Sequence, residues 1–390
     1  MSISDEIDLG DGYTNLALFG LDSRDGELGE GVRSDSIIIA SLNNKTKEIK
    51  MVSLYRDTLL ELEDGSLNKA NSAYAFGGPE EAVAMINKNL DLNIEHYVSV
   101  DFSVLVHVID ALGGIDINVE EAENGIDIIP YLNNYVVEVI KNTGVDSAPF
   151  TQLGQQHLNG VQATAYARLR YGGGDDYKRT ERQREVLEQI AIKAQKAKLS
   201  TINKIIDKVF DNVKTNFTLT ETIAYAKDVK SYKFGETQGF PYESTTANLD
   251  VGDSVVATDL ASDVTKLHQF LFGENDYTPS STVQSISEDI ANSTYDTGVS
   301  YDTEYNEYGY SQDYSGYDSG YTDNSYGTGG YQDSSYGDGS SGNGYTEDTG
   351  GDYVPPSDGG GTDSGSGDSN SQIPDTGTGD SGDTGGESLE

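Results

Sequence analysis

Short apolar runs separated by turn residues open the chain and predict three neighbouring strands. Residues 15–21 and 36–42 are apolar runs, and residues 48–54 alternate apolar and polar side chains after the turn residues 43–46. The second and third runs are therefore expected to form a hairpin. Because these runs are nearly continuous in apolar residues, both faces of their sheet should be covered.

The spacing of apolar residues then changes to that of helices alternating with strands. Pro79 suits the first position of a helix over 80–90, and two glycines end a helix over 102–112. Alternation of this kind is typical of an α/β sandwich. Further strands are expected at 96–100, 115–119 and 255–257, and further helices at 161–169, 180–197, 201–212, 219–230 and 260–272.

The distribution of charge divides the chain into two parts. The chain carries 66 Asp and Glu against 25 Lys and Arg, a formal net charge of −41. Lys266 is the last basic residue, and residues 277–390 hold 22 acidic residues among Gly, Ser, Thr and Tyr. Such a segment has too few apolar side chains to offset the entropy lost on folding, so we expect a disordered acidic tail. Its tyrosines leave open either a solvated spacer or a segment that stacks on sugars.

Composition also excludes several classes of protein. Without Cys, the chain cannot be a disulfide scaffold, a zinc ribbon, an iron–sulfur protein or a cysteine enzyme, and its four scattered His do not indicate a His-rich metal site. Its acidic surface would repel nucleic acid, which is therefore not an expected partner. No apolar run reaches the length of about 18 residues that a membrane helix needs. Residues 1–12 are acidic and polar, unlike a signal peptide.

Charged and polar residues stand at the ends of predicted strands and helices, and ligands bind beyond strand ends in open α/β sheets. The residues concerned are Asp22, Arg33, Asp35, Arg56, Arg168, Arg170, Asp176, Arg179 and Gln183. Two carboxylates at one sheet edge repel each other unless a cation separates them, and an all-oxygen set favours Mg²⁺ or Mn²⁺. Arginines bind phosphate oxygens in a bidentate fork. The combination indicates phosphoryl transfer, and the absence of a GxxxxGK[ST] loop argues against a nucleoside triphosphate as donor.

Each of these residues also has a purely structural interpretation. An Asp at a strand end is usually a turn or helix cap. The Arg56-Asp57 pair is equally compatible with a surface ion pair worth less than about 1 kcal/mol. Arg168 and Arg170 fit surface residues whose charged ends reach water. Residue types and spacing leave both interpretations open.

Eight short segments in a fixed order help to decide between a phosphate-binding site and a purely structural role for these residues. They are 33–38 (RSDSII), 52–58 (VSLYRDT), 69–80 (KANSAYAFGGPE), 97–102 (YVSVDF), 110–116 (DALGGID), 158–163 (LNGVQA), 167–170 (ARLR) and 176–183 (DYKRTERQ). Through them the chain, from residue 15 to about residue 194, resembles the LytR–CpsA–Psr family of Gram-positive cell-envelope proteins. One such segment is weak on its own, but the ordered set is specific.

The resemblance implies a phosphotransferase that is anchored by a single span on the extracytoplasmic face of the membrane of a Gram-positive type envelope. Such enzymes move a glycopolymer phosphate, from teichoic acid, capsule or another secondary wall polymer, from a polyprenyl-pyrophosphate carrier to peptidoglycan. The implied fold is an α-β-α sandwich with a central mixed sheet and a hydrophobic lipid tunnel. Two alternatives stay open: glycan transfer to a surface protein, and a non-catalytic wall-binding or regulatory protein with the same fold.

The resemblance also assigns roles to the residues at the strand ends. Asp22 and Asp35 correspond to the carboxylates associated with Mg²⁺ (or Mn²⁺), and either of them could deprotonate the acceptor hydroxyl. The implied catalytic set is Asp35, Asp22, Arg56, Arg168 and Arg170. The implied contacts to the pyrophosphate and head group are Arg33, Arg56, Arg168, Arg170, Asp176, Arg179 and Gln183.

Three departures from the family pattern affect these expectations. The chain opens at Met1 without the usual transmembrane helix, so we expect attachment to the membrane through an N-terminal anchor that is missing here. Tyr55 stands where the family usually has Pro, and residues 123–150 fit the pattern poorly and are assigned to the choice of acceptor.

Some apolar residues of the helices at 82–90 and 104–112 are expected to line the lipid tunnel.

The expected organisation has four parts. They are an N-terminal linker at 1–13, a catalytic domain at 14–197, a helical extension packed on it at 198–276, and the disordered tail at 277–390.

Overall fold

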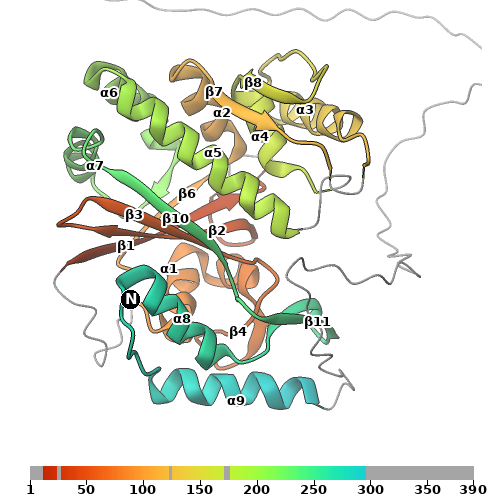
Figure 1. The fold of residues 1–390 in the computed structure, drawn as a ribbon, viewed down its shortest axis with the longest axis vertical. Coiled ribbons are helices and arrows are strands. Elements are labelled where there is room, and N and C mark those ends of the chain that lie inside the picture. The colour runs from red at the N-terminus through yellow and green to blue at the C-terminus, as the bar shows by residue number, and fades with distance from the viewer. Residues whose placement is uncertain (1–11, 24–27, 123–124, 171–175, 296–390) are drawn as a thin grey trace, which may run out of the picture. The chain divides into compact units, whose positions relative to one another are not determined.

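The computed structural model describes residues 12–23, 28–122, 125–170 and 176–295, which are built around a six-stranded mixed sheet (Figure 1). β1 pairs antiparallel with β2 and parallel with β6, and β3 pairs antiparallel with β2 and parallel with β10. The predicted α/β fold with a central mixed sheet is confirmed. In the order in which they lie side by side, the strands are β10 (Lys233–Phe240), β3 (Glu48–Leu54), β2 (Ser34–Asn43), β1 (Tyr13–Leu21), β6 (His96–Val100) and β9 (Lys214–Thr215).

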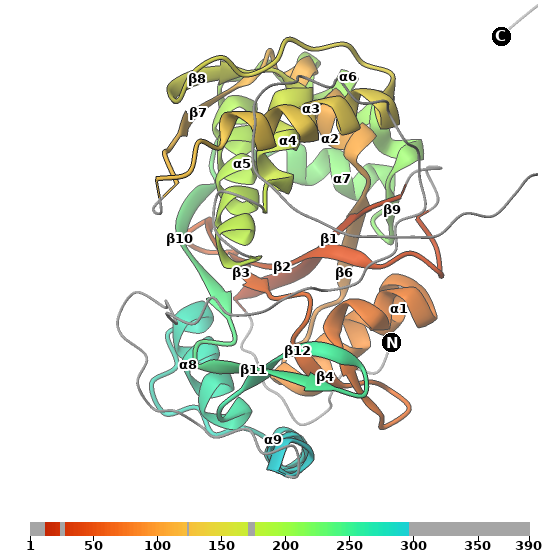
Figure 2. The ribbon, with the colours of Figure 1, turned by 90° about the vertical axis from the view of Figure 1, so that its right-hand side faces the viewer.

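Helices cover both faces of this sheet, so the fold has three layers (Figures 1 and 2). One face packs against α1 (Ala70–Leu90) and α8 (Leu260–Phe272). The other face is covered by α5 (Asp176–Lys196), α6 (Leu199–Val209), the short 3-10 helix η1 (Phe210–Asn212) and α7 (Leu219–Lys227). Beyond α5 a second core is formed by α2 (Phe102–Ala111), α3 (Ile129–Thr143), α4 (Gly160–Arg168) and the hairpin of β7 (Ile115–Val119) and β8 (Gly154–Leu158).

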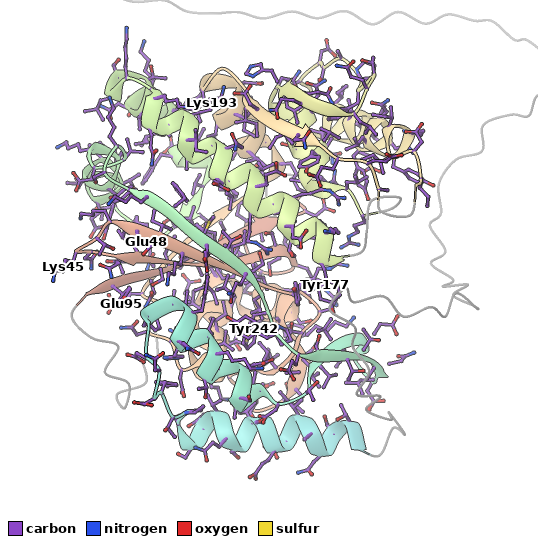
Figure 3. All side chains as sticks on the ribbon, viewed as in Figure 1. Lys45, Glu48, Glu95, Tyr177, Lys193 and Tyr242 are labelled. Carbon is purple, nitrogen blue, oxygen red and sulfur yellow. The ribbon has the colours of Figure 1, made fainter. Side chains whose placement is uncertain are left out.

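The alternation of side chains along the strands decides which core each residue enters. Ala17, Phe19 and Leu21 of β1 point into the large core shared with α1 and α8. Leu16 and Leu18, one position out of phase, point to the opposite face. Lys45 in the β2–β3 turn and Tyr177 on α5 lie at opposite ends of the sheet (Figure 3), and we call these the hairpin end and the Asp35 end.

The helix predicted at 80–90 is the second half of a longer, kinked helix. α1 begins at Ala70, and its backbone leaves helical geometry at Gly77 and Gly78 before Pro79 restarts it. Gly78 has φ 68° and ψ −160°, a conformation that only glycine adopts without strain. Pro79 has no backbone N–H and therefore suits the first turn after the kink.

The extension at 198–276, predicted as helical with one late strand at 255–257, also contains further strands. β10 joins the central sheet beside β3, and β11 (Ser244–Leu249) and β12 (Gly252–Ala257) form a separate hairpin. A further small hairpin, of β4 (Leu59–Glu61) and β5 (Leu67–Lys69), lies on the same side of the sheet. The extension therefore completes the sheet instead of only packing on it.

The described, helical part of the chain continues past the predicted boundary at residue 277. A last helix, α9 (Ser281–Tyr295), packs on α1 and α8, and its Val283, Ile286 and Ile290 are buried in the large core. Tyr277 and Ser280 tie the preceding turn to the Asp91 carboxylate through hydrogen bonds of 2.6–2.9 Å. The predicted disordered tail beyond residue 295 lies outside the described residues, as do most of the linker at 1–13 and residues 123–124.

The part of the chain that the structure describes contains no helix that is both long enough and apolar enough to cross a bilayer. Within residues 125–150, which fitted the family pattern poorly, the structure forms α3.

Candidate functional site

Asp35 and Arg56 lie side by side at the Asp35 end of the sheet and form an ion pair. Asp35 is the second residue of β2 and Arg56 follows β3, so the antiparallel pairing of these strands brings them together. Arg56 Nη1 donates to Asp35 Oδ1 at 2.7 Å, and Arg56 Nε donates to Asp57 Oδ2 at 3.2 Å. Two carboxylates therefore hold this arginine in one orientation.

Two further arginines act on the Asp35 carboxyl group. Arg179 on α5 is only 3% exposed, and its Nη2 donates to the Asp35 backbone oxygen at 3.4 Å. Burial acts to raise the pKa of Asp35, but the charges of Arg56, Arg179 and Arg170 hold that pKa below its usual range. Positive charge thus converges on a carboxylate that stays ionised, which is a setting suited to a polyanion.

Arg168, the last residue of α4, connects this cluster to Asp22 at the end of β1. Its Nη2 lies 3.7 Å from Asp22 Oδ2, and its Nη1 lies 3.4 Å from Glu138 Oε2. Its guanidinium carbon lies 4.2 Å from the ring centroid of Phe102 and 5.6 Å from that of Tyr135. With a side chain that is 15% exposed, Arg168 is not a surface residue reaching for water.

Tyr135 on α3 relates Arg168 to Arg170. Burial raises the pKa of the Tyr135 phenol, and the charges of Arg170 and Arg168 oppose that rise. Since Arg170 also acts on Asp35, the five side chains of the implied catalytic set form one connected neighbourhood. Their catalytic roles remain predictions.

The remaining candidate site residues from the sequence differ in their exposure and contacts. Gln183 lies on α5, and its Oε1 is buried without a hydrogen-bond partner among the described residues. Arg33 is exposed, and within the described ranges no ion pair joins it to Asp22 or Asp35. Asp176 begins α5, but its side chain lies outside what the structure describes.

The magnesium or manganese ion expected at Asp22 and Asp35 stays a prediction, and it would have to take most of its ligands from substrate and water. Asp22 Oδ1 is buried and accepts no hydrogen bond from a described residue, whereas Asp35 Oδ1 is bound by Arg56. Across the described ranges, no group of three or more His, Asp or Glu side chains could hold a metal. Mg²⁺ is commonly bound through one or two carboxylates together with phosphate oxygens, so these two residues would hold it.

Sequence reasoning missed Arg184, the neighbour of Gln183. Its side chain is 7% exposed, its Nε donates to Thr237 Oγ1 of β10 at 3.2 Å, and its Nη1 is buried with no hydrogen-bond partner among the described residues. Burial lowers its pKa, although Tyr55 and Glu181 act in the opposite direction. A buried cation that no described carboxylate contacts is a natural position for an anion. Its burial could have been inferred from the sequence, because Arg184 lies three residues before the apolar Leu187 and therefore shares the covered face of α5.

Three aromatic residues beside the cluster were also missed as site residues. Phe102 and Tyr135 flank Arg168 as described, and neither carries a charge that would draw attention in the sequence. Tyr55 packs edge-on against Tyr177 with ring centroids 4.5 Å apart. Its hydroxyl occupies the space that a Cβ at Gly239 would need, so this tyrosine requires a glycine on β10.

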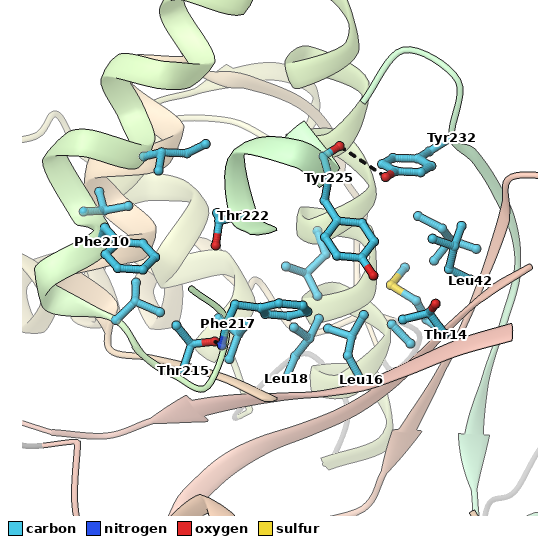
Figure 4. A pocket seen from close by; sticks show the side chains of 18 of the residues that line it. Thr14, Leu16, Leu18, Leu42, Phe210, Thr215, Phe217, Thr222, Tyr225 and Tyr232 are labelled. Carbon is cyan, nitrogen blue, oxygen red and sulfur yellow. Dashed lines mark hydrogen bonds between the residues drawn. The ribbon is translucent and has the colours of Figure 1, made fainter. Parts of the chain in front are cut away.

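An apolar cavity of about 430 Å³ lies between the sheet and the helices α5, α6 and α7 (Figure 4). Its roof includes Leu187 of α5, Ile206 of α6 and Tyr225 of α7. Its floor is made by Leu16 and Leu18 of β1, Ala40 and Leu42 of β2, and Ile49 and Met51 of β3.

The expectation that the helices at 82–90 and 104–112 line a tunnel is wrong for this cavity. Ala82, Val83, Ile86 and Leu90 are fully buried in the core on the other face of the sheet. Their side chains fill space there instead of lining it, because α8 and α9 complete that core.

The rows of side chains that form the cavity lead towards the charged cluster. Residues two apart face the same side of a strand, so the row of Leu16 and Leu18 continues through Gly20 towards Asp22. Residues four apart share a helix face, so the line from Leu187 on α5 continues through Gln183 to Arg179. Cavity and cluster therefore occupy successive positions along the same elements.

Comparison with known proteins gives the same fold and relates this chain to two named enzymes. Polyisoprenyl-teichoic acid–peptidoglycan teichoic acid transferase TagV of Bacillus subtilis is 31% identical over 258 residues, which are 64% of this chain and 62% of the relative. The corresponding transferase TagU of Enterococcus faecalis is 34% identical over 227 residues, 57% of this chain and 68% of the relative. The chain thus spans just under two thirds of the Bacillus subtilis relative's length.

The solved structure of B. subtilis TagV matches this fold with a TM-score of 0.52 at 29% identity, covering 69% of this chain and 100% of that one. The model of the LytR_cpsA_psr family matches residues 2–265. These residues include the sheet, the charged cluster and the walls of the cavity. The chain belongs to the LytR_cpsA_psr family.

Proposed function

We propose that this chain transfers a teichoic acid or related glycopolymer phosphate from a polyprenyl-pyrophosphate carrier to peptidoglycan. The observation that carries the proposal is that an apolar cavity and a cluster of arginines and carboxylates occupy successive positions along β1 and α5. The cavity suits a prenyl chain and the cluster suits a diphosphate. The names of the two relatives support the polymer and acceptor classes.

In the proposed reaction, the acceptor hydroxyl oxygen attacks the phosphorus that bears the polymer. A new O–P bond forms, the bond from that phosphorus to the bridging oxygen of the diphosphate breaks, and polyprenyl monophosphate leaves. Asp35 or Asp22 accepts the hydroxyl proton, and Arg56, Arg168 and Arg170 neutralise charge on the phosphate oxygens. Asp22 and Asp35 would hold a Mg²⁺ ion, which would supply further charge neutralisation. A peptidoglycan acceptor, which lies outside the membrane, would place the reaction at the outer face.

The proposal is tested by turnover with two donors, one with a long prenyl chain and one with a short, water-soluble chain. Ala40→Phe places a ring on the cavity floor, so KM for the long-chain donor should rise at least about tenfold while the short-chain donor is unaffected. Asp35→Ala and Arg168→Ala should abolish turnover of both donors without unfolding the protein. Full activity in both of these variants would show that the site is misassigned, and absence of donor binding by the wild type would favour a non-catalytic role.

A further inference from the structure

Basic charge is concentrated in one segment of this acidic chain. Residues 193–233 contain nine Lys and four Asp or Glu, although the whole chain has a formal net charge of −41. This segment includes β9 at the edge of the sheet. It also includes α6, η1 and α7, which wall the apolar cavity on the side away from the sheet.

Most lysines of this segment are directed to solvent, although Lys193 at its start pairs with Asp116 at 2.6 Å. Seven of the nine are exposed, and none of these seven forms an ion pair with a described residue. Some lysines outside the segment do pair with carboxylates: Lys88 pairs with Glu61 at 2.7 Å, and Lys266 pairs with Glu243 at 2.7 Å. The segment therefore presents positive charge that the protein does not use internally.

Apolar side chains are exposed among these lysines. Leu199 at the start of α6 is 43% exposed, and Leu219 and Tyr225 of α7 are 41% and 37% exposed. No residue of α7 is buried, and Tyr225 also lines the cavity. Large apolar residues mixed with lysines at the rim of an apolar cavity are typical of a surface that meets a lipid interface.

The basic segment lies towards the hairpin end of the sheet, away from the charged cluster. α6 and α7 lie on the same side of the molecule as the β2–β3 turn (Figures 1 and 3). Lys233 N donates to Lys47 O at 2.8 Å, which brings the two lysines of that turn, Lys45 and Lys47, beside the segment. We call the surface formed by residues 193–233 with Lys45 and Lys47 the basic rim.

We propose that the basic rim binds the anionic surface of a phospholipid bilayer, with the cavity opening towards the lipid. The rest of this acidic protein is repelled by such a surface, so the rim is the face on which close approach is favourable. A soluble polyanion would explain the lysines but not the exposed Leu199 and Leu219. The inference deepens the proposed function, because a donor held in the membrane by its prenyl chain would then meet the cavity directly.

The test measures sedimentation of the full chain with vesicles of phosphatidylcholine, alone or with 30% phosphatidylglycerol. Wild type should bind the mixed vesicles in low salt and be released at high salt. A lysine variant and a matched control each make the net charge more negative by four. The lysine variant is Lys204→Gln, Lys208→Gln, Lys227→Gln and Lys230→Gln. The control, on the exposed face of α9, is Thr282→Glu, Ser285→Glu, Ala291→Glu and Asn292→Asp.

The lysine variant should bind the mixed vesicles at least about tenfold more weakly than wild type, and the control should bind within about twofold of wild type. Leu199→Ser with Leu219→Ser should weaken binding severalfold, since an interfacial site buries apolar side chains. Equal binding by the lysine variant and the control would overturn the proposal. So would a preference of wild type for soluble poly(glycerol phosphate) over vesicles.

Turnover of the short-chain donor separates this proposal from the proposed function. The lysine variant should turn over that donor like wild type, because the rim lies away from the reacting groups. Vesicle binding that depends on the lysines, in a protein that turns over neither donor, would sustain the rim while the transferase proposal fails.

Discussion

Arg56 and Asp35 stand 21 residues apart in the chain, yet Nη1 of the arginine donates to Oδ1 of the aspartate at 2.7 Å. The register between β2 and β3 sets this meeting, since it places the end of one strand beside the start of the other. The two side chains are 21% and 29% exposed, and a partly exposed pair of this kind contributes little to stability. Its value lies in positioning charge for a ligand.

Replacing Arg56 should therefore affect turnover far more than folding. Arg56→Ala is expected to lower kcat/KM by about 100-fold or more, because a charge contact to the phosphate oxygens is lost. The free energy of unfolding should change by less than about 1 kcal/mol. Arg56→Lys should recover only part of the activity, because an ammonium cannot bind phosphate in a fork. Steady-state kinetics and urea unfolding of the three proteins check this, and full rescue by lysine would contradict the bidentate role.

The aromatic rings that flank Arg168 are expected to contribute to turnover through cation–π contacts with its guanidinium group. Tyr135→Leu and Phe102→Leu each remove a ring near the guanidinium, 5.6 Å and 4.2 Å away. Each should lower kcat/KM by about 3- to 30-fold, in line with a partly buried cation–π contact. Tyr135→Phe is the matched control: it keeps the ring and loses only the hydroxyl, which is hydrogen-bonded to the Arg170 backbone, so it should lose clearly less activity than Tyr135→Leu in the same kinetic assay. Equal damage by Tyr135→Phe and Tyr135→Leu would instead point to a role for the hydroxyl.

We expect Arg184 to lower the stability of the protein and to contribute to ligand binding. Arg184→Met removes a buried cation that no described carboxylate contacts, so the free energy of unfolding should rise by about 1–3 kcal/mol. Affinity for a polyprenyl-pyrophosphate analogue should fall at the same time, by about tenfold or more. Calorimetry gives both quantities. A variant that is less stable than wild type with unchanged affinity would show that Arg184 serves only the packing of α5 on β10.

The pH dependence of stability should be smaller without His268. This histidine is fully buried on α8, stacked on Tyr277 with ring centroids 3.6 Å apart, and its Nε2 lies 3.1 Å from the Leu90 backbone oxygen. Burial lowers its pKa below the ordinary value of 6.5. Below pH 6.5 the unfolded chain therefore takes up a proton that the folded chain does not, and stability falls as the pH falls.

His268→Gln removes this contribution. The variant should be less stable than wild type at pH 7.5, because it loses the ring stack, and the difference should shrink between pH 6.5 and pH 5. The slope attributable to one histidine cannot exceed about 1.4 kcal/mol per pH unit. Urea unfolding across this range measures it, and parallel curves for the two proteins would exclude His268 as the group concerned.

Two elements were not predicted from the sequence because their local composition is not typical of a strand or a helix, and tertiary contacts stabilise them. β10 contains two glycines and few apolar residues, and it becomes a strand because β3 offers its backbone a partner. α9 has buried residues at helical spacing, but it lies in a segment whose acidic, Ser- and Thr-rich composition suggested disorder. Three apolar side chains are enough to hold this helix in place, because α1 and α8 provide the apolar surface on which they pack.

The sequence by itself determined the first three strands, most of the helices and the residues of the charged cluster, because periodicity, caps and motifs are local properties of the chain. Only the tertiary structure decided which apolar helices fill a core and which leave a cavity, since that depends on what lies opposite each face. It also decided that Arg184 is a buried cation and that seven exposed lysines gather at one side of the cavity. A side chain's partners are set by strand register and packing between distant segments, and neither can be read from its neighbours in the sequence.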